Sequence, residues 1–178
     1  MRRTVLLFSA LLASHPAWSG ADAFSTGPVL EAFGENATVV DGLSNPAEQR
    51  FSVAFDVADA SDGAQPNRGF NSVARFLNMH VRAGVPAAQV QLALVVHGKA
   101  SLDLLSEEGY RMRFEKDNPS KGLVQALLEK GVAVILCGQS AAYLDIDAAE
   151  LMPGVEVSLS AMTAHAQLQQ QGYTVNPF

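Results

Sequence analysis

Two nearly unbroken apolar runs, Val90–Val96 and Val132–Cys137, constrain the fold of this chain more than any other feature. Such runs suit strands that are buried on both faces of a sheet. Around them lie segments whose apolar residues recur at helical spacing, such as Asn71–Arg82 and Ala161–Gln171. Strands that alternate with helices imply right-handed crossovers and a mainly parallel sheet. The predicted fold is therefore a three-layer α/β/α sandwich with a sheet of about five strands.

Asn118 and Pro119 predict the start of a further helix, because Asn caps helices and Pro is favoured at the first helical position. Gly131 is expected to end that helix, just before the second apolar run. Shorter segments complete the pattern. The remaining predicted strands are residues 51–57, 155–159 and 172–175, and the remaining short helices are residues 100–105 and 139–144.

Residues 1–23 have the features of a cleaved secretory signal peptide. Arg2 and Arg3 give a positive start, Val5–Ala13 is apolar, and Ala21–Ala23 reads as a small-x-small cleavage site. The apolar run is shorter than the roughly 20 residues that a membrane-spanning helix needs. We therefore expect a periplasmic protein that has no membrane association once the leader is removed.

Residues 24–49, which are rich in Gly, Pro, Asn and Asp, predict an extended arm that lies on one domain formed by residues 50–178. One domain is the expectation for a chain of 178 residues. Its 12 Lys and Arg residues face 18 Asp and Glu residues, giving a formal charge of −6. Binding to nucleic acid is disfavoured, because that binding depends on neutralising phosphates.

The single cysteine, Cys137, closes one of the two apolar strands, with Gly138 after it. In open parallel sheets, ligands and chemistry gather outside the carboxyl ends of the strands. Gln139 and Ser140 begin a helix there, whose N–H groups and dipole favour a thiolate. The alternative is a buried free cysteine that acts as a small apolar residue. An unpaired cysteine in an exported protein points instead to a reactive thiol or an intermolecular bridge.

His97 closes the other apolar strand, and it could move a proton or pair with a thiolate. Parallel strand tips lie about 5–10 Å apart when they are neighbours or next neighbours. His80 falls on the apolar stripe of a returning helix and is better explained as a core or interface residue. His165 stays ambiguous. Asp56 and Asn118 could line the same edge, although a loop carboxylate bonded to the backbone and a structural cap explain them better.

Motifs that the chain lacks narrow the chemistry further. We find no Cys-x-x-Cys, no His-Glu-x-x-His, no Gly-x-Gly-x-x-Gly and no phosphate-binding loop. A metal site would have to draw on dispersed histidines and one thiol. The sequence therefore predicts neither a metal nor a cofactor.

Four segments stand out by their order and spacing: Asn118–Pro119, Gly131–Val132, Val134–Ser140 and Leu151–Val155. Upstream of them lie two further stretches, Arg75–His80 and Val95–Ala100. The four segments resemble the DsrE/DsrF-like sulfur-relay family, and the two upstream stretches look like its exported, DsrE-like branch. The resemblance covers roughly residues 51–175.

This resemblance implies a homo-oligomer, such as a trimer or a hexamer, and sulfur donor and acceptor proteins as partners. By analogy, Cys137 carries sulfur as a persulfide, as in a sulfur carrier or sulfurtransferase, and His97 assists proton transfer. Two other hypotheses stay open: a non-enzymatic module that binds a small ligand, and a redox-sensing thiol or intersubunit disulfide. The predicted binding residues around the thiol are Gly98, Asn118, Gly138, Gln139 and Ser140.

Overall fold

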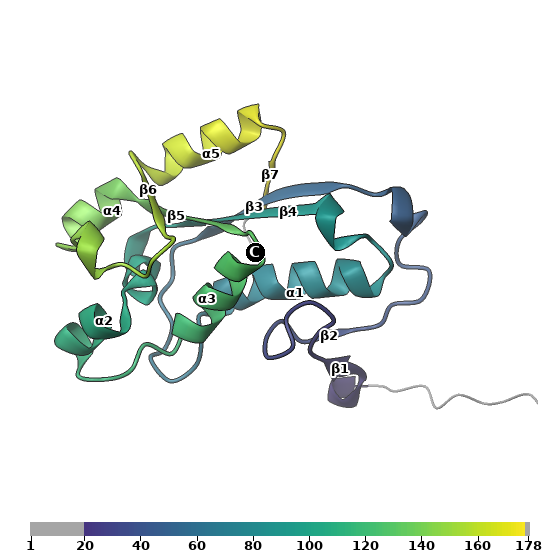
Figure 1. Ribbon diagram of the computed structural model, residues 1–178, viewed down its shortest axis with the longest axis horizontal. Coiled ribbons are helices and arrows are strands. Elements are labelled where there is room, and N and C mark those ends of the chain that lie inside the picture. The colour runs from purple at the N-terminus through teal and green to yellow at the C-terminus, as the bar shows by residue number, and fades with distance from the viewer. Residues whose placement is uncertain (1–19, 177–178) are drawn as a thin grey trace, which may run out of the picture.

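The structure, a computed structural model, describes residues 20–176 and centres on a five-stranded sheet in the order β6-β5-β4-β3-β7 (Figure 1). Every neighbouring pair in it is parallel, which confirms the predicted sheet and its class. Residues 1–19 of the predicted signal peptide lie outside the described part. The strands are β3 (Phe51–Val57), β4 (Val90–Val96), β5 (Ala133–Cys137), β6 (Glu156–Ser158) and β7 (Thr174–Asn176).

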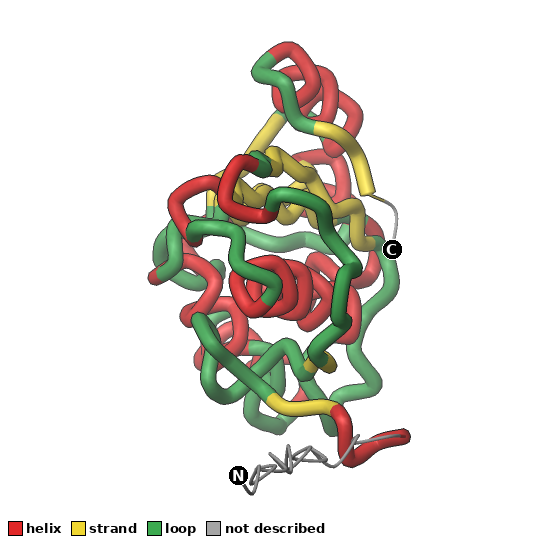
Figure 2. Tube along the Cα trace, turned by 90° about the vertical axis from the view of Figure 1, so that its right-hand side faces the viewer, coloured by secondary structure: helices red, strands yellow, loops and turns green. Residues whose placement is uncertain are grey.

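Helices cover both faces of the sheet and complete the three layers (Figures 1 and 2). One face carries α1 and α3, and the other carries α5, while α4 continues directly from the tip of β5. No helix in the described range is long and apolar enough to cross a membrane. The helices are α1 (Arg68–Arg82), α2 (Glu107–Phe114), α3 (Lys121–Glu129), α4 (Gly138–Tyr143) and α5 (Ala161–Gln170), and the 3-10 helices are η1 (Gly20–Ala23), η2 (Pro46–Glu48), η3 (Ala87–Gln89), η4 (Gly98–Leu104) and η5 (Ala148–Glu150).

The two faces of the sheet bury very different side chains. The face under α1 and α3 packs large aliphatic and aromatic residues, including Phe55, Phe70, Leu94 and Leu127. Under α5, the buried cluster is small and consists largely of alanines. Its members are Ala54, Ala93, Val95, Cys137, Ala161, Ala164 and Leu168. The single cysteine therefore lies in the thinner of the two layers.

Three local predictions were wrong in detail. The helix predicted over Asn71–Arg82 begins at Arg68, because the Asn67 side chain accepts hydrogen bonds from the N–H groups of Gly69 and Phe70. The sequence reading missed α2, which Ser106 caps by accepting from Gly109 N–H. This helix buries few residues, so its apolar pattern is weak.

Asn118 does not start a helix, and α3 begins three residues later at Lys121. The Asn118 amide group instead donates to the carbonyl oxygens of Asp103 and Leu105, while its oxygen accepts from Ser120 N–H. These hydrogen bonds hold a loop on the α1 and α3 side of the sheet. Asn118 is thus structural in this fold.

Residues 24–49 lie against α1 and contain the antiparallel pair β1 (Phe24–Ser25) and β2 (Asn36–Ala37) (Figure 1). Asn78, fully buried on α1, accepts from the N–H of Leu30 and donates to its carbonyl oxygen. The Arg82 guanidinium donates to carbonyl oxygens of Ser25, Thr26, Gly27 and Asn36. Side-chain donors and acceptors on one helix therefore fix a segment that has little regular structure of its own.

Candidate active site

Three polar residues lie at the carboxyl edge of the sheet, on the face that α5 covers. Asp56 of β3 pairs in register with Val95 of β4, and Val96 pairs with Leu136 of β5. Successive residues of a strand point to opposite faces, so His97 and Cys137, which follow the last pair, share one face. Topology thus brings residues 56, 97 and 137 to three adjacent strand tips.

Cys137 is 5% exposed, and its thiol lies where β5 turns into α4. Burial raises the pKa of this thiol, but hydrogen bonds from the Ser140 hydroxyl and from the N–H groups of Ser140, Ala161 and Gln139 lower it by more, so the pKa lies below its usual range. The donors come from two segments, the start of α4 and the start of α5. Their arrangement favours a thiolate, which is the reactive form of cysteine.

Ser140 connects the thiol to the loop after β4. The N–H of Gly98 donates to Ser140 Oγ over 3.0 Å, which leaves the hydroxyl proton free to bond to the sulfur. Gly98 has a positive φ of 54°, and a Cβ on it would lie 3.0 Å from the carbonyl oxygen of Ala58. Both the positive φ and the tight contact favour a glycine at the position that orients the serine.

Gly138 allows β5 to approach the β6–α5 loop closely. A Cβ on Gly138 would lie 2.7 Å from the carbonyl oxygen of Ser158, a separation too short for any side chain. Gln139, the next residue, donates from Nε2 to the Leu159 carbonyl oxygen over 3.2 Å. The two segments that supply N–H groups to Cys137 are thereby held against each other.

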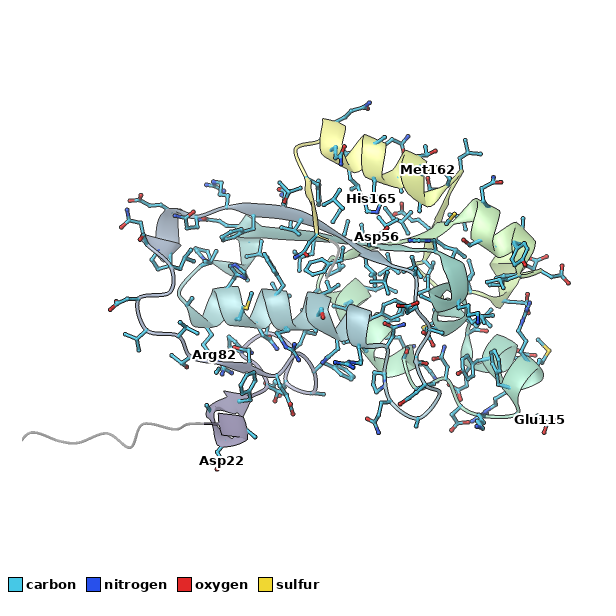
Figure 3. The ribbon with its side chains drawn as sticks, turned by 180° about the vertical axis from the view of Figure 1, so that it is seen from behind. Asp22, Asp56, Arg82, Glu115, Met162 and His165 are labelled. Atoms are coloured by element: carbon cyan, nitrogen blue, oxygen red, sulfur yellow. The ribbon has the colours of Figure 1, made fainter. Side chains whose placement is uncertain are left out.

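Asp56 joins two histidines that lie far apart in sequence. Its Oδ2 lies 3.1 Å from His97 Nε2, and its Oδ1 lies 2.7 Å from Nε2 of His165, which reaches down from α5 (Figure 3). Burial raises the pKa of Asp56, but the hydrogen bonds from both rings and their positive charge lower it by more. The carboxylate is therefore ionised and fully engaged at neutral pH.

The structure brings together most of the residues predicted from the sequence. Cys137, Gly138, Gln139 and Ser140 form one continuous turn, and His97 and Gly98 lie on the neighbouring strand tip. Asn118 is the exception, because it bonds to loops on the other side of the sheet. Sequence reasoning did not assign roles to Asp56 and His165; the position of Asp56 just before the end of a strand is the one signal that pointed to this edge.

His80 lies elsewhere, on the arm side of α1. Its ring stacks on Phe76 at 3.9 Å between centroids and its Nδ1 is 2.7 Å from the Phe76 carbonyl oxygen. Burial lowers the pKa of this histidine below its usual value, although the bond to Phe76 opposes the shift. Within residues 20–176, no three or more His, Cys, Asp or Glu side chains gather as a metal site would require.

The fold and this edge define a class: a parallel α/β protein with a single cysteine at the tip of an inner strand. Residues 51–177 match the DsrE/DsrF-like family, so the chain belongs to that family. No curated protein matches the chain.

Two solved structures share the fold. A protein of unknown function, MTH1491 from Methanobacterium thermoautotrophicum, is 20% identical, with a TM-score of 0.50 over 72% of this chain and 99% of that one. The ychN protein from E. coli is also 20% identical, with a TM-score of 0.51 over 72% of this chain and 100% of that one. At this identity the likeness establishes the fold alone.

Proposed function

We propose that this protein is a sulfur carrier that holds sulfur as a persulfide on Cys137. The observation that carries the proposal is the position of Cys137 at the end of β5, where α4 begins and where the start of α5 also supplies an N–H group that favours its thiolate. Donors of this kind stabilise a thiolate before transfer and the terminal anion of a persulfide after it. The general association of the family with sulfur relay supports the same chemistry.

The transfer balances with thiosulfate as the sulfur donor. The Cys137 thiolate attacks the outer sulfur, the S–S bond of thiosulfate breaks, and sulfite leaves with the bonding electron pair. The products are the persulfide anion on Cys137 and sulfite, and no external oxidant is needed. In the second half, a partner's thiolate attacks the outer sulfur of the protonated persulfide and regenerates the Cys137 thiolate. His97 would take up and return the proton.

Exposed apolar side chains beside the thiol give partners a surface to bind. Met162 is 80% exposed and Leu159 is 72% exposed, and Tyr143 and Val157 add to the same end of the molecule. Exposed apolar groups of this size are typical of protein interfaces. We place the sulfur donor and acceptor proteins, and a homo-oligomer such as a trimer or hexamer, among the proposed partners, and propose that the protein works in the periplasm after export.

Mass spectrometry of residues 24–178 after exposure to thiosulfate or polysulfide tests the proposal. We expect a gain of about 32 Da, one sulfur atom, on the peptide that contains Cys137, and its loss on treatment with a reducing thiol. Cys137→Ser should abolish the gain. If the wild-type protein gains no sulfur under conditions that load a known carrier, the proposal fails.

A second candidate function is the binding of a small ligand at the same edge. A cavity of about 690 Å³ lies beside the end of β3, lined in part by Asp56, Asn67 and Arg68. Under this alternative Cys137→Ser would leave ligand-dependent thermal stabilisation unchanged.

The third hypothesis, a disulfide between subunits, fits a thiol that is 5% exposed less well. A covalent dimer on a non-reducing gel would support the disulfide hypothesis.

A further inference from the structure

We propose that Asp56 and His165 are positioning residues that fix the ring of His97 as the proton acceptor for Cys137. The inference rests on the proposed function, which gave His97 a proton to move without saying what orients it. The three side chains come from β3, from the residue that follows β4 and from α5, and they meet through two hydrogen bonds to one carboxylate. Each ring uses its Nε2 atom for that contact.

The carboxylate dictates which ring nitrogens carry hydrogen. An ionised carboxylate only accepts hydrogen bonds, so the Nε2 atoms of His97 and His165 must both be donors. When either ring is neutral, its Nδ1 is then the unprotonated nitrogen. The same logic operates wherever a carboxylate holds one ring nitrogen of a catalytic histidine and leaves the other as the base.

The two histidines differ in what surrounds Nδ1. Nδ1 of His165 is buried and has no hydrogen-bond partner, so a proton placed there would be an unsatisfied donor. The His97 side chain is a third exposed, and its Nδ1 is not among the buried unpaired atoms of the described residues. His97 is therefore the ring that can accept a proton and pass it to water.

The sheet register places His97 beside Cys137 on the adjacent strand. This histidine follows Val96, which pairs with Leu136, and Cys137 follows Leu136 on the adjacent strand. Adjacent strands lie about 4.8 Å apart. Because Nε2 is held toward β3, on the far side of β4 from β5, we place one water between the thiol and Nδ1. The Sγ–H bond breaks, the proton passes through this water to Nδ1, and a thiolate and an imidazolium form beside ionised Asp56.

His165 has a separate task under this proposal. Its Nε2 donates a hydrogen bond to Oδ1 of Asp56, so Oδ2 of the same carboxylate is the oxygen that accepts from His97. Without His165, the carboxylate could rotate or bind both oxygens to solvent. A side chain that restores one N–H donor should therefore restore the effect, whereas an apolar side chain of similar size should not.

The test measures alkylation of Cys137 by iodoacetamide from pH 6 to pH 9, with sulfur loading from thiosulfate measured in parallel. For Asp56→Asn we expect a loss of about tenfold in alkylation rate at pH 7, and recovery to within about twofold of wild type at pH 9, where hydroxide removes the proton. His165→Leu should lose about threefold at pH 7, and His165→Gln should regain it. Asp62→Asn, at an exposed position in the loop that follows β3, is the matched control and should behave as wild type.

An Asp56→Asn rate equal to wild type at every pH would overturn the inference, as would an equal loss at pH 7 and pH 9. Ring ¹⁵N NMR gives an independent check: neutral His97 and His165 should both carry hydrogen on Nε2, and hydrogen on Nδ1 of either ring contradicts the proposal. If wild type alkylates as expected but never loads sulfur, the proposed function fails while the positioning role stands. If it loads sulfur and the variants match it, only the positioning role fails.

Discussion

The two faces of the central sheet are built for different purposes. Under α1 and α3 lies a thick layer of large side chains that reaches from the arm to the carboxyl edge. Under α5 lies a thin layer of alanines, one valine, one leucine and the cysteine. The thick layer buries most of the apolar area, and burial of that kind is the main favourable contribution to folding. The thin layer holds the polar site.

A thin layer suits a reactive thiol for a geometric reason. Small side chains on β3 and β4 let α5 lie close to the sheet, and this closeness brings the Ala161 N–H to Cys137 and the His165 ring to Asp56. Larger residues would lift the helix and break both contacts. The comparison teaches that stability and chemistry are separated across the sheet, and substitutions on each face can test that separation.

The largest expected effect is on the thick face. Leu94→Ala removes a fully buried side chain between α1 and the sheet, and we expect a loss of about 4 kcal/mol in the free energy of unfolding. Chemical denaturation, monitored by circular dichroism, measures this loss. Thiol alkylation in the folded protein should stay near the wild-type rate, because Leu94 faces away from the site.

The matched change on the thin face is Leu168→Ala. Leu168 packs from α5 onto the alanines of the sheet, where fewer large neighbours surround it, and we expect a loss of about 2–3 kcal/mol. Here alkylation of Cys137 should change as well, since α5 carries both Ala161 and His165. A cost equal to that of Leu94→Ala, with no change in thiol reactivity, would contradict the division between the faces.

A smaller effect should follow from adding volume to the thin face. Ala93→Val places two methyl groups under α5 at a fully buried position, and we expect a loss of about 1–2 kcal/mol as the helix is displaced. The ring NMR signals of His165 should shift in the same variant. If the His165 signals do not shift, α5 is not displaced by the added methyl groups, and the close packing under this helix is contradicted.

The smallest expected effect concerns the thiol alone. Ser140→Ala removes a hydroxyl donor from the Cys137 sulfur, so the pKa of the thiol should rise toward its usual value. The thiolate fraction at pH 7 then falls, and the rise of alkylation rate with pH moves to higher pH. The control is Ser52→Ala, near the start of β3, at the end of the sheet away from the thiol. A shift to lower pH would show that Ser140 opposes the thiolate.

Most of the sheet could be predicted because its strands are continuous apolar runs. The bounds predicted for β3 and β4 match the structure, as each run begins and ends at polar or glycine-rich turns. Helix starts were less predictable, because a capping side chain can hydrogen-bond either to the first N–H groups of a helix or to other nearby backbone groups. The amide oxygen of Asn67 caps α1 while its amide nitrogen donates to Asp59 and Asp103. The amide nitrogen of Asn118 is held by Asp103 and Leu105, and its oxygen accepts from Ser120 N–H before α3 has begun.

The candidate site divides in a similar way. The turn that begins at Cys137 is contiguous, so a motif and a strand end were enough to place it. The contact between Asp56 and His165 spans 109 residues of sequence. It depends on how closely α5 lies to the sheet, and no local pattern encodes that distance. Asp56 alone reads as an ordinary loop carboxylate, and only its two ring partners reveal more.

Gly138 has a consequence for how a protein of this kind can diverge. Because no side chain fits between it and the Ser158 carbonyl oxygen, the main chains on either side of the thiol are locked at a fixed separation. Three of the hydrogen-bond donors to the sulfur are main-chain N–H groups that this lock sets in place. The exposed side chains at 159 and 162 can therefore be exchanged to suit a new partner while the sulfur keeps its surroundings. The surface that binds partners can therefore change between related proteins while the reactivity of the thiol is kept.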